Sequence, residues 1–284
     1  EIYTLSLHDA LPIYNSKKIE LYDCILLGAA AAFGILSKYL FIYLLVAIDL
    51  LFAYLIFFKK SKKFDFKYLV SLEVFFVILI PHIIWLFNND FITIKYGFAR
   101  AGLDEGQIIN HLKYPLIFTL KQIGILIPFL ILVWLLIKKI PKKLNLKDEK
   151  LLFLIFINLV PIVLVFMTAL ITGSKIRTMW MTPFYLFFGT LFIYLLKTQI
   201  NIKKLNSFLI GFIFLFLLSP ILYGYVSISQ TDKRTDYPGK DIAIKVQMAW
   251  HEQHDEPIKY VLGDEWTAGN LSYHINSRPI WKGF

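Results

Sequence analysis

The chain has 284 residues, of which 57% are hydrophobic and 18% are charged, and its mean hydropathy is +0.62. This balance lies far outside that of soluble domains. The formal net charge is +10, but the lysines gather in short clusters between apolar runs, where lipid headgroups and membrane orientation explain them better than nucleic acid does. We therefore expect an integral membrane protein that contacts membrane lipids, crosses the bilayer several times and binds no nucleic acid.

The first thirteen residues, EIYTLSLHDALPI, read codon by codon as the translation of a common sequencing-library adapter. Agreement over the whole stretch in one frame favours an artefact over a natural amphipathic leader, so residues 1–13 are not expected to belong to the fold. We expect the natural amino-terminal part to be missing from this chain. The carboxyl end stops directly after an expected strand, so we expect truncation there as well.

Apolar runs of roughly 20 residues, the length that crosses about 30 Å of hydrocarbon, organise residues 14–228. The expected spans, the first of them short, are residues 22–37, 39–58, 68–87, 115–137, 151–172, 179–196 and 206–228. Lysine clusters fall on every second loop, which the positive-inside rule places in the cytoplasm. The segments at about residues 88–114, 173–178 and 229–284 are then extracytoplasmic.

Local signals refine this picture. The run LLGAAAAFGIL before the turn at Ser37 and Lys38 supplies small residues that let helices approach closely. Pro81, Pro128 and Pro161 lie within spans and are expected to kink them.

The tail from about residue 229 changes character. Its segment PGKDIAIKVQMAWHEQHDEP places Ile242, Val246, Ala249 and Trp250 on one helical face, and IKYVLG then resembles a short buried strand. The predicted fold class is an all-α polytopic membrane bundle of about seven transmembrane helices with a small carboxyl-terminal extracytoplasmic α/β domain at residues 229–284.

Ionisable groups in or near a span are costly and therefore functional candidates. They are Lys38, Asp49, Glu73, His82 and Lys121. Snorkelling toward the interface accounts for Glu73 and Lys121, and a structural hydrogen bond is the favoured account of His82. Asp49 lies in the middle of its span and needs a polar partner that the sequence does not name. The single cysteine, Cys24, excludes an intrachain disulfide and a thiolate metal site.

Basic and aromatic residues collect on the expected outer segments. An ammonium or guanidinium group suits a phosphate oxygen, and aromatic rings can stack on a sugar or isoprenoid. The candidate phosphate contacts are Lys38, Lys95, Arg100, Lys175 and Arg177, and the candidate stacking residues are Tyr96 and Trp180. The alternative interpretation is a solvated rim with no ligand.

Four segments in order resemble bacterial GT-C membrane glycosyltransferases of the dolichyl-phosphate-mannose protein mannosyltransferase-like (aminoarabinose transferase-like) family. They are LLGAAAAFGILSKYLFIYLL, PHIIWLFNNDFITIKYGFARAG, GSKIRTMWMTPFYL and the tail AWHEQHDEPIKYVLGDEWTAGNLSYHINSRP. Their order and the topology agree with that family over about residues 15–284.

The resemblance implies an inverting transfer of a sugar from a polyprenyl-phosphate donor to a lipid, glycan or protein acceptor on the outer face of the membrane. In that family an acidic residue of the first outer loop is the general base. Basic residues, and often a divalent metal, stabilise the leaving phosphate. That loop precedes everything in this chain, so Asp90 and Asp104 are not its equivalents, no catalytic residue is assigned, and no metal ligand is named.

Two other classes of function stay open. A transporter or lipid flippase could use the basic cluster and Asp49 equally well, although we find no inverted repeat, which such proteins often carry. A non-catalytic scaffold whose outer domain binds a partner is the third possibility. The sequence has no Walker loop, no HExxH and no GxSxG, which argues against ATP-driven transport and the common hydrolases.

Overall fold

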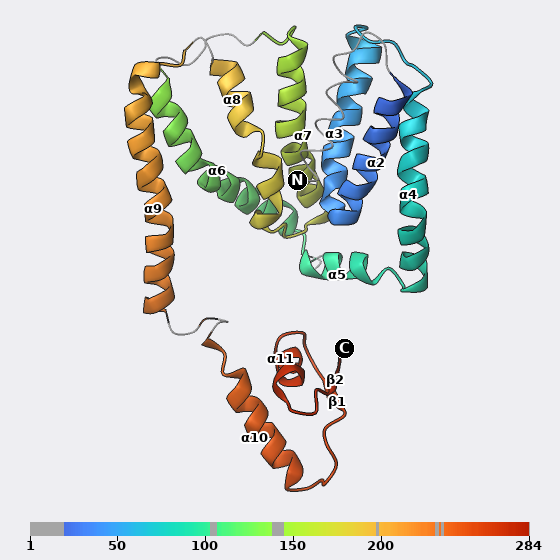
Figure 1. Cartoon of the computed structure of the whole chain (residues 1–284), viewed down its shortest axis with the longest axis vertical. Coiled ribbons are helices and arrows are strands. Elements are labelled where there is room, and N and C mark those ends of the chain that lie inside the picture. The colour runs from blue at the N-terminus through green and yellow to red at the C-terminus, as the bar shows by residue number, and fades with distance from the viewer. Residues whose placement is uncertain are drawn as a thin grey trace. The chain divides into compact units, whose positions relative to one another are not determined.

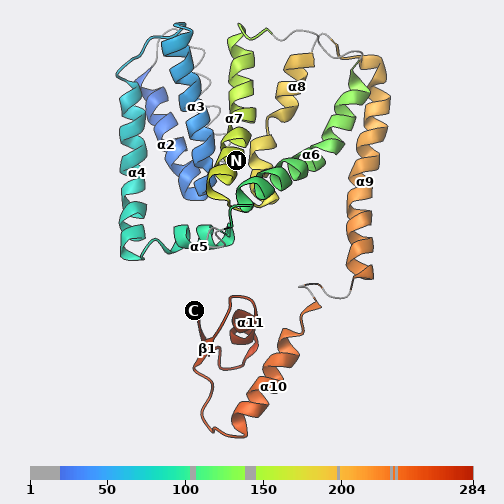
Figure 2. The same ribbon diagram turned by 180° about the vertical axis from the view of Figure 1, so that it is seen from behind.

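The computed structural model describes residues 20–102, 107–137, 145–196, 199–230, 233 and 236–283. The expected adapter stretch at residues 1–13, Asp104, and several lysines of the inner clusters lie outside the described residues. The chain divides into two compact units, residues 1–212 and 213–284 (Figures 1 and 2).

Helices make up the first unit. In chain order they are α2 (Leu21–Ser37), η1 (Tyr39–Phe41), α3 (Ile42–Ala53), the π-helical η2 (Tyr54–Phe58), α4 (Tyr68–Asn88), α5 (Ile92–Arg100), α6 (Asn110–Leu136), α7 (Glu149–Thr172), η4 (Thr178–Tyr185), α8 (Phe188–Leu196), η5 (Ile202–Lys204) and α9 (Leu205–Ser229), which continues into the second unit.

Five helices among the described residues are long and apolar enough to cross a membrane: Tyr39–Phe58, Tyr68–Asn88, Asn110–Leu136, Glu149–Thr172 and Ile202–Ser229. A bent pair, η4 with α8, makes a sixth if it counts as one span. The polytopic helical bundle is thus confirmed. Helix α2, the expected short span, has only 17 residues.

The span expected at residues 179–196 is not one straight helix. Its first part, η4, is a 3₁₀ helix, and the chain bends by 49° between η4 and α8. Pro183 lies within η4, where it lacks the N–H that an α-helix requires and crowds the preceding turn. The prolines expected to kink spans, Pro81, Pro128 and Pro161, lie inside helices that continue past them. The kinks themselves stay predictions.

The two most extensive helix pairs of the first unit are α2 with α4 and α3 with α7, and α6 and α8 also pack on α7. The apolar core lies mainly on the second pair and includes Leu44, Leu51, Ile157 and Val165. Helix α9 has no buried residue and exposes many large apolar side chains. Such surfaces are the ones that lipid covers in a membrane protein.

Close approach of α2 and α4 depends on Gly28. A Cβ atom added there would lie 2.3 Å from the Ser71 carbonyl oxygen, so only a glycine fits. At the turn, Gly34 makes room in the same way for the ring of the fully buried Phe41. The small residues predicted to permit a tight helical hairpin therefore make two different contacts possible: Gly28 lets α4 approach α2, and Gly34 makes room for Phe41 after the turn.

The described parts of the expected cytoplasmic loops gather at one end of the first unit, the upper end in Figure 1. Lys59 Nζ donates to the Lys147 carbonyl oxygen at 2.9 Å and lies 3.3 Å from Glu149 Oε1. Ile137 and Ile200 form an antiparallel bridge that joins two more of these loops. Helix α5 and residues 173–178, which were expected outside, lie at the other end.

The second unit contains α10 (Gly239–His251), β1 (Tyr260–Leu262), α11 (Thr267–His274) and β2 (Ile280–Lys282), and the two strands pair in parallel. The helix and the strand predicted in this segment are both present. Val246 and Trp250 pack against a small core, as expected. Ala249 is exposed, contrary to prediction. The buried alanine of this helix is Ala243, which lies six residues earlier, on the face that Val246 and Trp250 share.

Candidate functional site

Helix α5 lies crosswise at the expected outer end of the first unit, beside the ends of α2, α3 and α4 (Figure 1). The chain enters it through Asp90 and Phe91, which have positive φ angles of 50° and 54°. For non-glycine residues this left-handed conformation is strained and persists only where the surroundings stabilise it. The contacts of α5 with its neighbours supply that stabilisation.

The first of these contacts passes through Tyr39. Its hydroxyl is hydrogen-bonded to His82 Nε2 at 2.8 Å and to Thr93 Oγ1 at 2.9 Å. The His82 ring also stacks on Trp85, with centroids 5.7 Å apart. His82 is thus hydrogen-bonded, as its structural interpretation expects. Because Tyr39 follows Lys38 directly, the same bonds hold the turn that carries Lys38 against α4 and α5.

A second contact joins the far end of α5 to the loop after α7. The Lys175 N–H donates to the Ala101 carbonyl oxygen at 2.7 Å. Gly173, with a φ of 65°, ends α7 and lies against the ring of His111. His111 Nδ1 is in turn 2.9 Å from the Leu170 carbonyl oxygen. Helices α6 and α7 and the loop are therefore held together next to α5.

The candidate phosphate contacts come from these three neighbouring segments. Lys38 lies in the turn after α2, where partial burial lowers the pKa of its ammonium group. Lys95 and Lys175 are exposed, and Arg177 is half-buried at the start of η4. The structure thus brings the segments together at one end of the bundle, while Lys95 and Lys175 direct their charges toward the surroundings.

The aromatic candidates lie beside two of the cations. The Arg100 guanidinium carbon is 5.4 Å from the centroid of the Tyr96 ring, a cation–π arrangement. The half-buried Trp180 donates its backbone N–H to the Arg177 carbonyl oxygen at 3.0 Å. Tyr96 is therefore already occupied by an intrachain cation on one face.

Lys38, Lys95, Lys175 and Arg177 form no ion pair with another described residue. Cations that lack a carboxylate partner can bind an external anion without first breaking an internal pair. The described part of the chain holds no group of three or more His, Cys, Asp or Glu side chains that could bind a metal ion. The divalent metal implied by the family resemblance stays a prediction, and we derive no step through one.

Tyr39 and Thr93 were not among the predicted site residues. Tyr39 bonds to partners 43 and 54 positions away, and no motif or spacing in the sequence links them. The small-residue run that precedes the turn signals a helical hairpin but not the hydrogen bonds that fasten it.

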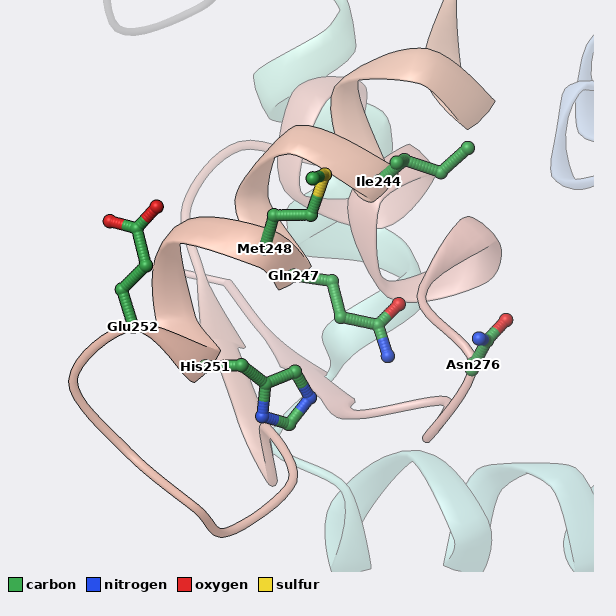
Figure 3. Close-up of a pocket in the computed structure, with 6 residues that line it drawn as sticks. All are labelled: Ile244, Gln247, Met248, His251, Glu252 and Asn276. Atoms are coloured by element: carbon green, nitrogen blue, oxygen red, sulfur yellow. The ribbon is translucent and has the colours of Figure 1, made fainter.

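The second unit has an open hollow of its own, of about 580 Å³. Figure 3 shows the Gln247 amide and the His251 ring facing the side on which Asn276 lies, whereas the Glu252 carboxylate points away. Ile244 and Met248 complete the lining. With no lysine or arginine among its lining residues, this hollow does not suit a phosphate group.

The described residues form a multi-pass helical bundle. At its expected outer end lie Lys38, Lys95, Lys175 and Arg177, none of them ion-paired with another described residue. Residues 7–85 match the sequence model of the dolichyl-phosphate-mannose-protein mannosyltransferase family. The matched stretch contains α2, α3, most of α4 and the turn with Lys38. The resemblance to GT-C mannosyltransferase-like proteins is confirmed on this stretch, which is less than a third of the chain.

No curated protein and no solved structure matches the chain. The family match begins at residue 7, inside the expected adapter stretch. Genomic sequence upstream of Tyr14 decides the origin of those residues, since a genomic copy of EIYTLSLHDALPI would refute the adapter interpretation.

Proposed function

We propose that this chain is part of a membrane glycosyltransferase of the GT-C type. The enzyme would transfer a sugar from a polyprenyl-phosphate donor to a lipid, glycan or protein acceptor on the outer face of the membrane. The observation that carries the proposal is the family match over the hairpin whose turn presents Lys38. The neighbouring cations of α5 and of the loop after α7 support it. The two-stranded unit that follows α9 is proposed to lie on the same outer side.

In this reaction an acceptor hydroxyl attacks the anomeric carbon, the bond from that carbon to the phosphate oxygen breaks, and the lipid phosphate leaves with inversion. The hydroxyl proton passes to a general base that we assign to no residue of this chain. Lys38, Lys95, Arg100, Lys175 and Arg177 would stabilise the negative charge of the leaving phosphate. Tyr96 and Trp180 would stack on the sugar or on the first isoprene units.

Binding tests the donor assignment. The chain is placed in nanodiscs of zwitterionic lipid, and its affinity for radiolabelled polyprenyl phosphate is compared with that for the matching polyprenyl alcohol. We expect tighter binding of the phosphate, and a loss of about tenfold in Lys38→Gln and in Arg177→Gln, since a charged hydrogen bond contributes about 1.5 kcal/mol or more. Lys240→Gln, at an exposed lysine of α10, is the control.

Equal affinity for phosphate and alcohol would refute a phosphate site. Turnover is tested with protein expressed from its genomic locus, using donors with labelled sugars. The absence of both sugar transfer and polyprenyl-phosphate binding in that protein would reject the proposed function altogether.

A further inference from the structure

A groove of about 400 Å³ lies between the two helix pairs of the first unit. One wall is α2 with α4, which meet closely at Gly28, and the opposite wall is α3 with η2. On α3 and η2 the lining residues follow one stripe at helical spacing: Ile42, Leu45, Ile48, Asp49, Phe52, Ala53, Ile56 and Phe57. The volume and the mostly apolar lining are those of a small-molecule site.

The groove contains one carboxylate, that of Asp49, among otherwise almost entirely apolar neighbours. Asp49 has no hydrogen bond or ion pair with any of the described residues. A carboxylate at the middle of a span is costly unless a cation or a donor meets it. Among the described residues, the opposite wall lines the groove with the hydroxyl-bearing side chains of Tyr68 and Ser71 and with no lysine or arginine.

A second polar group in the groove lacks a full partner. The buried hydroxyl oxygen of Ser71 forms no hydrogen bond within the geometric limits. That hydroxyl faces the sulfur of the buried Cys24, but a cysteine sulfur is a weak acceptor. Because the Ser71 oxygen is buried, a molecule in the groove meets the carboxylate of Asp49 rather than this hydroxyl.

We propose that this groove binds a lipophilic amine, with its apolar body between the helix pairs and its ammonium group against Asp49. The negative charge of the carboxylate favours an ammonium group over a neutral group. The apolar stripe on α3 and η2 favours a hydrocarbon chain. The site is separate from the cluster of cations at the outer end, so it stands or falls independently of the proposed glycosyl transfer.

Photolabelling tests the proposal on the full chain in zwitterionic nanodiscs. The probe is dodecylamine with a diazirine in its alkyl chain, and the matched neutral probe is the same molecule with a hydroxyl in place of the amine. We expect the amine to label groove peptides about tenfold more than the alcohol, with untagged dodecylamine but not dodecane competing. Asp49→Asn should bring the ratio near one, and Asp49→Glu should retain it.

Matched controls separate a built site from the surrounding lipid. Ala53→Phe should fill the groove and suppress labelling by both probes, whereas Val77→Phe, on an exposed position of α4, should not. Glu73→Gln removes an exposed carboxylate of α4 and should leave the ratio of amine labelling to alcohol labelling unchanged. If Asp49→Asn keeps the amine preference, or if wild-type labelling is as strong on α9 as in the groove, the proposal is wrong.

Discussion

Replacing Gly28 by alanine should separate α2 from α4. The added Cβ would lie 2.3 Å from the Ser71 carbonyl oxygen and 3.0 Å from Val74 Cβ, whereas ordinary contacts begin near 3.4 Å. The obstacle is backbone, so one helix must move by about 1 Å, and overpacking of this kind costs about 1–3 kcal/mol. Alanine also favours the helix by up to about 1 kcal/mol, which leaves a net loss of roughly 1–2 kcal/mol.

The matched substitution is Gly124→Ala in α6, where an added Cβ meets nothing within 4 Å. That change should stabilise the protein by about 0.5–1 kcal/mol through helix propensity alone. Thermal unfolding of both variants in the same detergent should therefore place Gly28→Ala below the wild type and Gly124→Ala at or above it. Equal or reversed midpoints would refute the argument from close helix approach.

Two further outcomes are expected. Tyr39→Phe removes the hydrogen bonds to His82 and Thr93 and should lower the free energy of unfolding by about 1–3 kcal/mol. Amide hydrogen exchange should become faster in α5 but not in α7. Unchanged exchange in α5 would contradict this prediction. The hydrogen bonds that Asp264 accepts from the Thr267 hydroxyl and N–H, opposed by a smaller desolvation effect, lower its pKa below 3.8. The hydrogen bonds from Asp264 to the start of α11 are therefore complete above pH 3.8 and are lost as the pH falls through the lowered pKa. Hydrogen-exchange protection of the Thr267 amide, corrected for intrinsic rates, should drop in that pH range in the wild type. In Asp264→Ala this protection should be absent at every pH.

Hydrophobic length and lysine placement predicted most of the membrane unit because both act locally along the chain. The broken span near Pro183 was missed, since a proline in an apolar run is compatible with either a kink or a break and neighbouring helices decide between them. The segments of the cation cluster were predicted from charge and topology. Tyr39 and Thr93 were not, because their contact depends on how α5 folds back across the bundle.

That crosswise helix has a mechanical consequence. Helix α5 is fastened near its start by the bond from Tyr39 to Thr93 and after its end by the bond from Lys175 to Ala101. A helix attached at both ends cannot slide or tilt freely. It can rotate about one attachment only after the hydrogen bond at the other has broken. We therefore expect a displacement of the turn at Lys38 to be passed through α5 to the loop after α7, so that Lys38 and Lys175 shift together rather than separately.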